Sequence, residues 1–198
     1  MGFIDTIKAR AKADKKVIVL PETEDRRTYE ATAQILKEGI ADVVLVGSEE
    51  AIKKGSEGLD ISGAKIVDPA TSEKTQGYID KLVELRSKKG MTPEQAKEIL
   101  LNQYLYYGVM MVKMGDADGM VSGACHSTAD TLRPCLQILK TKPGTKLVSA
   151  FLPDGSSGLR IWCKRYFRIC RFRTEPESES GRTGSYRSFL RRILQTVG

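Results

Sequence analysis

The sequence has one histidine, one tryptophan and four cysteines among its 198 residues, and it has no long hydrophobic run. Its apolar stretches fall short of the ~18 residues that a membrane-spanning helix needs. The cysteines form no Cys-X-X-Cys pair and no histidine cluster accompanies them, so we predict neither a metal site nor a disulfide framework. Residues 1–16 contain an acidic residue and lack the apolar core of a secretory signal. These absences predict a cytoplasmic protein that does not contact a membrane.

The net charge of +7 is distributed unevenly along the chain. Residues 151–198 hold ten Lys and Arg against four Asp and Glu, whereas residues 1–150 are nearly neutral. After residue 151 the sequence also loses any sustained periodicity. We therefore divide the chain into an N-terminal domain, residues 1–150, and a basic, irregular and disordered tail, residues 151–198. The tail lacks aromatic residues arranged on a folded platform, so a nucleic acid is not the expected partner.

Residues 1–150 alternate between strand and helix patterns, which predicts an α/β fold with a mostly parallel sheet flanked by helices. Short β-branched runs indicate the strands, and spaced apolar residues with glycine stops indicate the helices. The predicted strands are 16–20, 41–46, 64–68, 119–121 and 146–151. The predicted helices are 28–37, 49–54, 72–88, one capped by Thr92 with Pro93 at its first position, 101–114 and 131–140.

One loop, VSGACHSTADTLRP at residues 121–134, has the residues of an anion-binding site. It follows a predicted strand and ends on a helix, whose free N–H groups attract negative charge. The small residues around Ser122 allow a ligand close to the backbone, and Ser127 and Thr131 add hydroxyl groups. Arg133 offers a planar pair of donors to a phosphate or carboxylate. Taken alone, these residues fit anion binding and simple helix capping equally well.

The same loop, with its continuation CLQILKTKPG, resembles the signature of the phosphate acetyltransferase and phosphate butyryltransferase family. The segments VLPETEDRRTYEATAQILKEGIADVVLVG, ELRSKKGMTPEQA and GDADGMVSGA resemble further parts of that family in the same order. The resemblance covers residues 1–150 and favours the acetyl branch, with the butyryl branch as the alternative. It implies an incomplete isocitrate/isopropylmalate dehydrogenase-like fold, since the family enzymes are longer and place their active site between two α/β domains.

The resemblance also implies an activity and a set of site residues. Family members transfer acetyl between coenzyme A and phosphate, forming or consuming acetyl phosphate, with no tightly bound cofactor. Arg86 and Arg133 match substrate-binding arginines, and Ser127 and Thr131 fall where the family binds the phosphoryl group. Ser122 joins this set because of its hydroxyl group. The family's catalytic base lies beyond the end of this sequence, so no catalytic residue is assigned and activity is expected to be crippled. The parent enzyme is expected to be a homodimer.

The genetic code offers an explanation for the tail. Residues 159–174, LRIWCKRYFRICRFRT, can be encoded so that reading one base later gives CEYGANGTFVFADSG, a motif with which the family would continue. The same shift turns residues 175–197 into LNQNPNPEELAAIAVSSAESFKLL, which has the pattern of a turn and an amphipathic helix. We hypothesise that a one-base insertion or deletion near Phe151 put the tail out of frame.

Two classes of function stay open: an acyltransferase, and a non-enzymatic role as an inert gene fragment or a basic-tailed binding module. His126 is interpreted as a loop residue beside the phosphate site rather than as a general base. The acidic residues in 22–25 are expected in a solvated loop rather than at a metal, and Cys125 and Cys135 are expected to be buried. The tyrosines and methionines in 104–111 are expected to pack in a helical core or at an interface.

Overall fold

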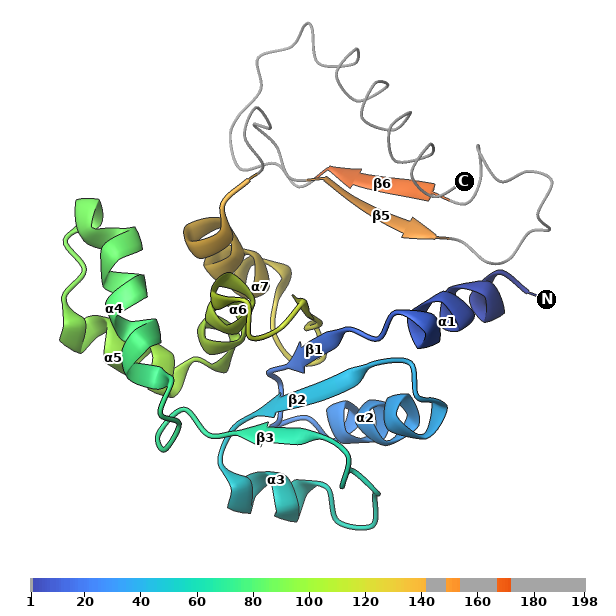
Figure 1. Cartoon of the computed structure of the whole chain (residues 1–198). Helices are drawn as coiled ribbons and strands as arrows, with labels where there is room; N and C mark the ends of the chain where they lie inside the picture. Colours follow the sequence, from blue (N-terminus) through green and yellow to red (C-terminus); the bar gives the residue numbers. More distant parts are fainter. Residues whose placement is uncertain (1, 142–148, 154–166, 172–198) are drawn as a thin grey trace, which may run out of the picture. The chain divides into compact units, whose positions relative to one another are not determined.

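The computed structural model describes residues 2–141, 149–153 and 167–171, and in the first of these ranges four short strands form one sheet (Figure 1). The strands are β1 (Val17–Leu20), β2 (Asp42–Val46), β3 (Lys65–Val67) and β4 (Gly119–Met120). They lie in the order β3-β2-β1-β4, and every pair is parallel. The predicted mostly parallel α/β fold is confirmed, and each strand lies within a range predicted from the sequence.

Helices cover both faces of this sheet. The helices are α1 (Phe3–Ala13), α2 (Arg26–Glu38), α3 (Glu49–Gly55), α4 (Thr75–Arg86) with a following 3-10 turn (Ser87–Lys89), α5 (Pro93–Asn102), α6 (Tyr104–Met114) and α7 (Thr128–Pro134) with a following π-helical turn (Cys135–Leu139). Their ends follow local chemistry: Asp25 caps α2 through the N–H of Arg27, and Gly39 ends it in the left-handed conformation. The capping box predicted at Thr92 and Gln95 is present at α5.

The segment predicted as one apolar helix over 101–114 is broken at Gln103. This residue has an extended backbone, with φ −126° and ψ 88°, and its carbonyl accepts from the N–H of Tyr106 to start α6. The apolar pattern runs through the break, so periodicity could not reveal it. The last helix differs as well, because α7 begins three residues before the predicted Thr131 and its cap is Ser127.

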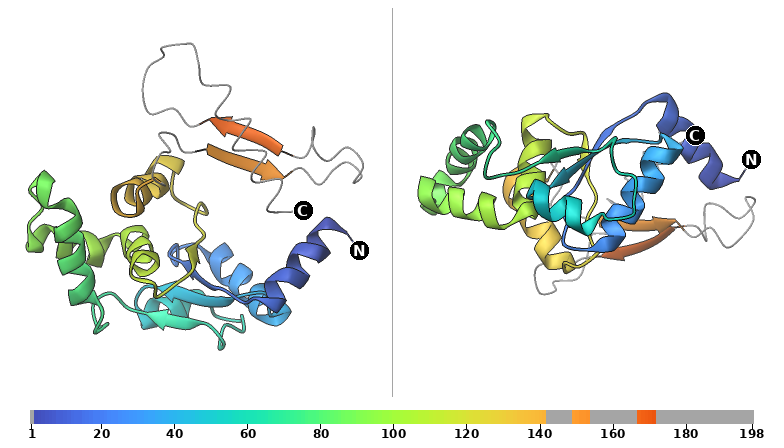
Figure 2. Two further views of the ribbon diagram at one scale, coloured as in Figure 1. Left: turned by 45° about the horizontal axis from the view of Figure 1, so that its top comes forward. Right: turned by 90° about the horizontal axis from the view of Figure 1, so that it is seen from below.

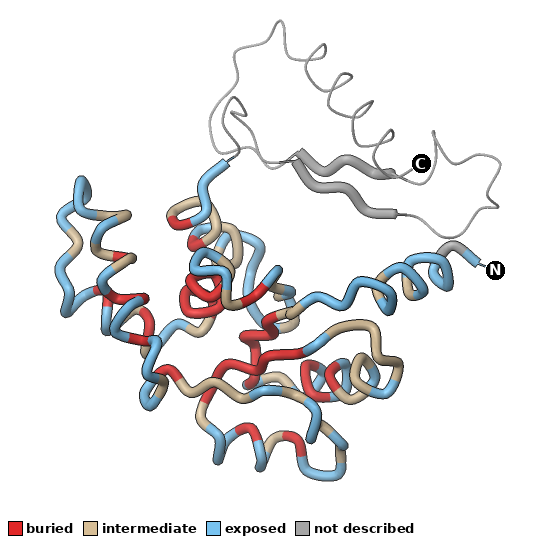
Figure 3. Tube along the Cα trace, viewed as in Figure 1, coloured by how far each residue is buried: buried red, intermediate tan, exposed pale blue. Residues whose placement is uncertain are grey.

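Two apolar clusters lie on the two faces of the sheet. On one face, Leu20, Val43 and Leu45 pack with Tyr29 of α2 and Ile52 of α3. On the other face, the strand residues Val19, Val44 and Val46 pack against α4, α5, α6 and the turn after α7. Tyr107 and Met110 of α6 belong to this second cluster. Figure 3 shows the buried residues concentrated in β1, β2 and α6. The expectation of a packed core is confirmed for the α6 residues Tyr106, Tyr107, Met110 and Met111.

Two packing features bring α6 and its neighbours into place. Gly108 lets α6 approach the sheet closely, because a Cβ there would lie 2.9 Å from Met120 Sδ and 3.2 Å from Val19 Cγ1. Helices α4 and α5 lie side by side at one end of the domain (Figure 2), and the ring of Tyr78 in α4 meets the ring of Tyr107 edge-on at 5.1 Å. These contacts fix the junction of α5 and α6 beside the carboxyl edge of the sheet.

The chain divides into two compact units, Met1–Lys146 and Leu147–Gly198. In the second unit, β5 (Ser149–Pro153) and β6 (Phe167–Arg171) form an antiparallel pair. Strand β5 overlaps the strand predicted at 146–151, of which residues 146–148 lie outside the described residues. Strand β6 lies in the tail that we expected to be irregular. The other tail residues lie outside the described ranges. No helix in the described part of the chain is long and apolar enough to span a membrane.

Candidate functional site

The sheet topology points to the carboxyl ends of the neighbouring strands β1 and β4 as the place to look for a site. From β1 the chain builds β2 and β3 on one side and then returns to place β4 on the other side. In open parallel sheets, ligands bind beyond the carboxyl ends of the strands at such a switch point. Two loops meet at this place: residues 21–25, which follow β1, and residues 121–127, which follow β4 and lead into α7.

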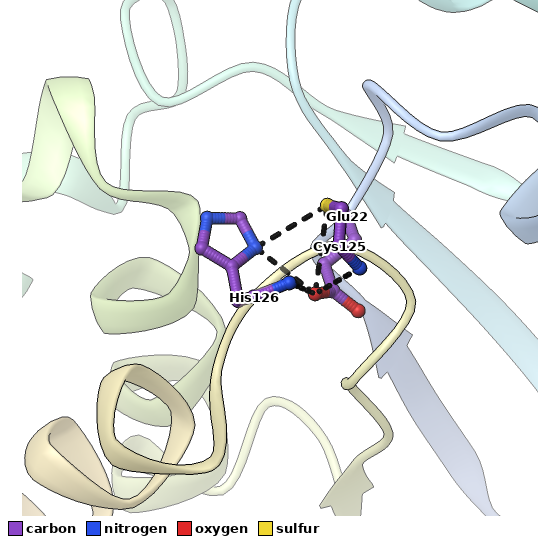
Figure 4. A group of neighbouring side chains, drawn as sticks. All are labelled: Glu22, Cys125 and His126. Atoms are coloured by element: carbon purple, nitrogen blue, oxygen red, sulfur yellow. Dashed lines mark hydrogen bonds and ion pairs between the residues drawn. The ribbon is translucent and has the colours of Figure 1, made fainter.

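The carboxylate of Glu22 joins these two loops (Figure 4). Its Oε2 accepts the backbone N–H groups of Gly123 at 2.6 Å and Ala124 at 2.7 Å. Its Oε1 accepts the backbone N–H groups of Cys125 at 3.2 Å and His126 at 2.9 Å, and it lies 2.9 Å from His126 Nδ1. Four successive amides of the predicted anion-binding loop therefore hold an anion from within the chain.

The expectation that Glu22 lies in a solvated loop is wrong, because only 2% of the residue is exposed. Burial alone would raise the pKa of its carboxyl group, but the hydrogen bonds from Ala124, Gly123, Cys125 and His126 outweigh burial and lower this pKa to about 2. Glu22 is thus a buried, ionised and fully hydrogen-bonded group. The signal available in the sequence was an acidic residue directly after a buried strand, where parallel strands end.

The segment after Glu22 holds the same loop from a second side. The guanidinium group of Arg27 donates to the carbonyl of Ala124. Asp25 fixes that guanidinium group, with Arg27 Nη2 2.7 Å from Asp25 Oδ2 and Arg27 Nε 3.0 Å from Asp25 Oδ1. Gly123 completes the turn with φ 123°, a backbone conformation that favours glycine. Arg27 was not among the site residues predicted from the sequence.

The three predicted hydroxyl residues come together at the start of α7. Ser127 caps this helix by accepting the N–H of Asp130 at 3.2 Å, and its own hydroxyl donates to Asp130 Oδ2 at 2.6 Å. The hydroxyl groups of Ser122 and Thr131 lie 3.3 Å apart. The predicted cluster of hydroxyl groups is therefore present, and each hydroxyl has a partner within the domain.

The two predicted arginines occupy different positions. Arg133 lies in the last turn of α7 with 59% of its side chain exposed and Nη1 3.6 Å from Asp130 Oδ1. Arg86 ends α4, and its Nε is buried with no hydrogen-bond partner among the described residues. Tyr106 connects them: burial raises the pKa of its phenol, and the positive charges of Arg133 and Arg86 oppose that rise. The Tyr106 hydroxyl itself donates to Gln137 Oε1 at 3.0 Å.

A cavity of about 620 Å³ opens beside the two loops. Its walls come from the loops that follow β1, β2 and β4, the start of α3, the junction of α5 and α6, and helix α7. The lining residues are Thr23, Glu24, Ser48, Ala51, Leu101, Asn102, Gln103, Tyr104, Leu105, Tyr106, His126, Asp130 and Arg133. Of the predicted site residues, Arg133 lines the cavity directly, whereas Arg86, Ser122, Ser127 and Thr131 do not. The unexpected break at Gln103 forms part of its wall.

Glu22, Cys125 and His126 place one ligand-type atom each within 4.8 Å of one another. Hydrogen bonds already engage both carboxylate oxygens of Glu22. Burial of the Cys125 sulfur and the negative charges of Glu24 and Glu22 raise the pKa of the thiol to about 12, although the residue as a whole is exposed. The exposure corrects our expectation of a buried Cys125, and Cys135 is partly buried. A protonated thiol and a saturated carboxylate favour a structural role for this group over metal binding.

Known proteins resemble this chain in sequence and in fold. The sequence matches the family described as Phosphate acetyl/butaryl transferase over residues 2–179. It is 56% identical over 151 residues to a phosphate acetyltransferase of Acetivibrio thermocellus, and the match covers 76% of this chain and 45% of that protein. It is 47% identical over 188 residues to a phosphate acetyltransferase of Clostridium acetobutylicum, covering 90% of this chain and 55% of that protein.

Solved structures give the same result. The EutD phosphotransacetylase from Staphylococcus aureus superposes with a TM-score of 0.72 at 36% identity, covering 87% of this chain and 51% of that chain. A phosphotransacetylase from Streptococcus pyogenes superposes with a TM-score of 0.70 at 37% identity, covering 77% of this chain and 47% of that chain. The chain therefore spans about half the length of the relatives that it matches.

Proposed function

The chain belongs to the phosphate acetyl/butaryl transferase family, and we propose that it takes part in the transfer of acetyl between coenzyme A and phosphate. The observation that carries the proposal is the cavity at the switch point of the sheet, with Arg133 on its wall and the start of α7 beside it. The names of the relatives favour acetyl over butyryl as the transferred group. The substrates are then coenzyme A and acetyl phosphate, or acetyl-CoA and phosphate.

Arg133 is the group best placed to hold the phosphoryl end of acetyl phosphate. Its side chain lines the cavity, is more than half exposed and has only one ion-pair partner, Asp130, at 3.6 Å. A guanidinium group with free donors can bind two phosphate oxygens at once. The hydroxyl groups of Ser122, Ser127 and Thr131 add further donors after rotation, and Arg86 adds positive charge near Tyr106.

The chemistry of the loop supports direct transfer without an acyl-enzyme intermediate. The loop contains one thiol, that of Cys125, and its pKa of about 12 keeps it protonated at neutral pH. A protonated thiol is a poor nucleophile, so Cys125 is not expected to form an acyl-enzyme, and we propose that the thiol of coenzyme A attacks the acetyl carbon itself. Holding the two substrates in one cavity supplies the orientation that such a two-substrate step requires.

We propose in addition that residues from about 151 onward are out of frame. Two observations support this: the codon argument for residues 159–197, and the 56% identical alignment that extends over only 151 residues. The family match itself continues to residue 179. Resequencing the gene tests the proposal. An intact downstream frame encoding CEYGANGTFVFADSG would support it, and its absence would refute it.

Binding of acetyl phosphate and inorganic phosphate, measured by calorimetry on the purified chain, tests the proposed function. We expect Arg133→Gln to weaken both by about ten- to a hundredfold, since a charge-assisted pair of hydrogen bonds is lost. Arg10→Gln is the matched control, because Arg10 is exposed on α1 and does not line the cavity. Equal affinities for the two variants, or no binding by the unchanged chain, would refute the proposal. Acetyl-CoA formation in the same preparation measures how much activity this chain has.

A further inference from the structure

The segment that leads into α7 is held by little apolar packing. In the described stretch 121–134, Pro134 is the one buried residue, and it stands at the far end of the helix. Residues 123 and 125–129, which form the loop and the first turn, are exposed. Apolar contacts therefore do little to place the start of α7, so hydrogen bonds have to set its position.

Most of those hydrogen bonds lead to one carboxylate. The backbone N–H groups of residues 123–126 all donate to Glu22, at 2.6 to 3.2 Å. Figure 4 shows Glu22 beside Cys125 and His126, and His126 directly precedes Ser127, the cap of α7. The carboxylate thus holds the backbone up to the residue at which the helix begins.

Glu22 is itself fixed to the centre of the sheet. Its backbone carbonyl accepts the hydroxyl group of Thr28 at 2.7 Å. The next residue, Thr23, donates its hydroxyl group to the carbonyl of Val46, the last residue of β2, at 2.7 Å. The hydroxyl group of Tyr29 donates to the carbonyl of Thr23. The loop after β1 is therefore tied to β2 and α2, and its carboxylate passes this fixed position on to the loop after β4.

We propose that Glu22 is a positioning residue for phosphate binding: its carboxylate sets the start of α7 and thereby the place of Arg133 on the cavity wall. The inference rests on the proposed function. Arg133 lies within two helical turns of Ser127, so a displaced first turn displaces its guanidinium group as well. A guanidinium group binds two phosphate oxygens only when its plane faces them, and small displacements weaken that pair of bonds.

The charge of Glu22 separates this role from two simpler ones. Its pKa of about 2 means that the carboxylate is ionised at neutral pH. A negative charge bonded to His126, which lines the cavity, repels phosphate, so removing the charge alone should strengthen phosphate binding. A carboxylate that only stabilises the fold should leave the phosphate affinity of the folded chain unchanged. Of the three roles, positioning alone predicts weaker binding when the charge is removed.

Calorimetry with inorganic phosphate on Glu22→Gln, Arg133→Gln and the double variant tests the proposal. We expect Glu22→Gln to weaken phosphate binding about three- to tenfold, the size of one misplaced hydrogen bond. The same change should have no further effect in the Arg133→Gln chain, because no guanidinium group is left to place. Unchanged or stronger binding by Glu22→Gln, or an equal loss in both backgrounds, would overturn the positioning role. If Arg133→Gln weakens binding in that case, the proposed function stands.

Thr75→Val is the matched control for lost stability. Thr75 is also buried, and its hydroxyl group donates to the carbonyl of Pro69 at 2.8 Å, but it does not line the cavity. Thr75→Val should therefore lower the melting midpoint and leave phosphate affinity unchanged. If Thr75→Val weakens phosphate binding as much as Glu22→Gln does, the loss comes from general destabilisation and the positioning role fails.

A measurement on the unchanged chain does not depend on whether Glu22→Gln folds. When inorganic phosphate is added, the Nε–H resonance of Arg133 should shift in ¹⁵N NMR. The amides of Gly123 and Ala124 should keep their protection from hydrogen exchange, because Glu22 still holds them. Loss of that protection would mean that phosphate displaces the carboxylate, which overturns the positioning role. If no resonance shifts, the proposed function fails, and the role of Glu22 fails with it.

Discussion

The two loops at the carboxyl edge of the sheet differ in a way that their sequences do not suggest. The loop at 121–127 is rich in small and polar residues and was expected to bind a phosphate through its amides. The acidic loop at 21–25 was expected to face solvent. In the structure, the first loop keeps an exposed Cys125, whereas the second buries Glu22 to 2% exposure.

The difference shows that the backbone N–H donors of a loop can be taken up by an acceptor from the same chain. Gly123, Ala124, Cys125 and His126 all donate to Glu22, so their N–H groups are not available to a ligand. The anion that these amides attract is therefore structural. Under the proposed function, substrate binding depends on the side chains around the cavity, and Arg133 is the first of these.

Glu22→Gln should break this arrangement and give the largest loss of stability. The amide group of glutamine keeps one acceptor but places two N–H donors among the four backbone N–H groups that now surround the carboxylate. We expect a loss of about 3 kcal/mol and a melting midpoint lower by roughly 10 °C. Glu24→Gln is the control, because Glu24 is half exposed and should change the midpoint little. A Glu22→Gln midpoint equal to that of the control would contradict the assignment.

The free energy of unfolding should depend on pH through the carboxyl group of Glu22. The pKa of Glu22 is lowered from its ordinary value of 4.5 to about 2 in the folded chain. Its contribution is therefore complete above pH 4.5 and is lost as the pH falls from 4.5 through about 2. The lowering corresponds to about 3 kcal/mol. Urea titrations of the unchanged chain and of Glu22→Gln should give stabilities that converge over this window. A constant difference between them would show that the carboxyl pKa is not lowered.

Much of the fold follows from short-range sequence patterns. The features that could not be predicted have no signature in such patterns. The strand runs and the caps at Thr92 and Gly39 depend on neighbouring residues, so the sequence revealed them. The bond from Glu22 to Gly123 joins residues about a hundred positions apart and has no local signature. The break at Gln103 interrupts a continuous apolar pattern, and the pattern alone predicted one helix. The site loop was found by motif, whereas the residues that hold it were not.

Gly123→Ala tests whether the shape of the loop at 121–127 depends on glycine. Gly123 has φ 123°, and a Cβ there would meet nothing within 4 Å, so any cost comes from the backbone alone. We expect a loss of about 1–3 kcal/mol in chemical denaturation. Gly77→Ala is the matched control. A Cβ there would also meet nothing within 4 Å, but Gly77 lies inside α4, where alanine should raise the free energy of unfolding by about 0.5–1 kcal/mol. A Gly123→Ala variant as stable as the unchanged chain would contradict the strain at Gly123.

Ser127→Ala should have the smallest effect on stability. It decides between two interpretations of the loop: helix capping alone, or helix capping together with phosphate binding. Ser127 caps α7 and Thr92 caps α5, and each hydroxyl accepts one backbone N–H. Loss of either cap should cost about 1 kcal/mol. Thr92 lies neither in the loop at 121–127 nor on the cavity wall, so Thr92→Ala should leave phosphate affinity unchanged. Ser127→Ala should also weaken phosphate binding by about two- to tenfold, the size of one hydrogen bond. If calorimetry gives both variants the same phosphate affinity, Ser127 is a helix cap and nothing more.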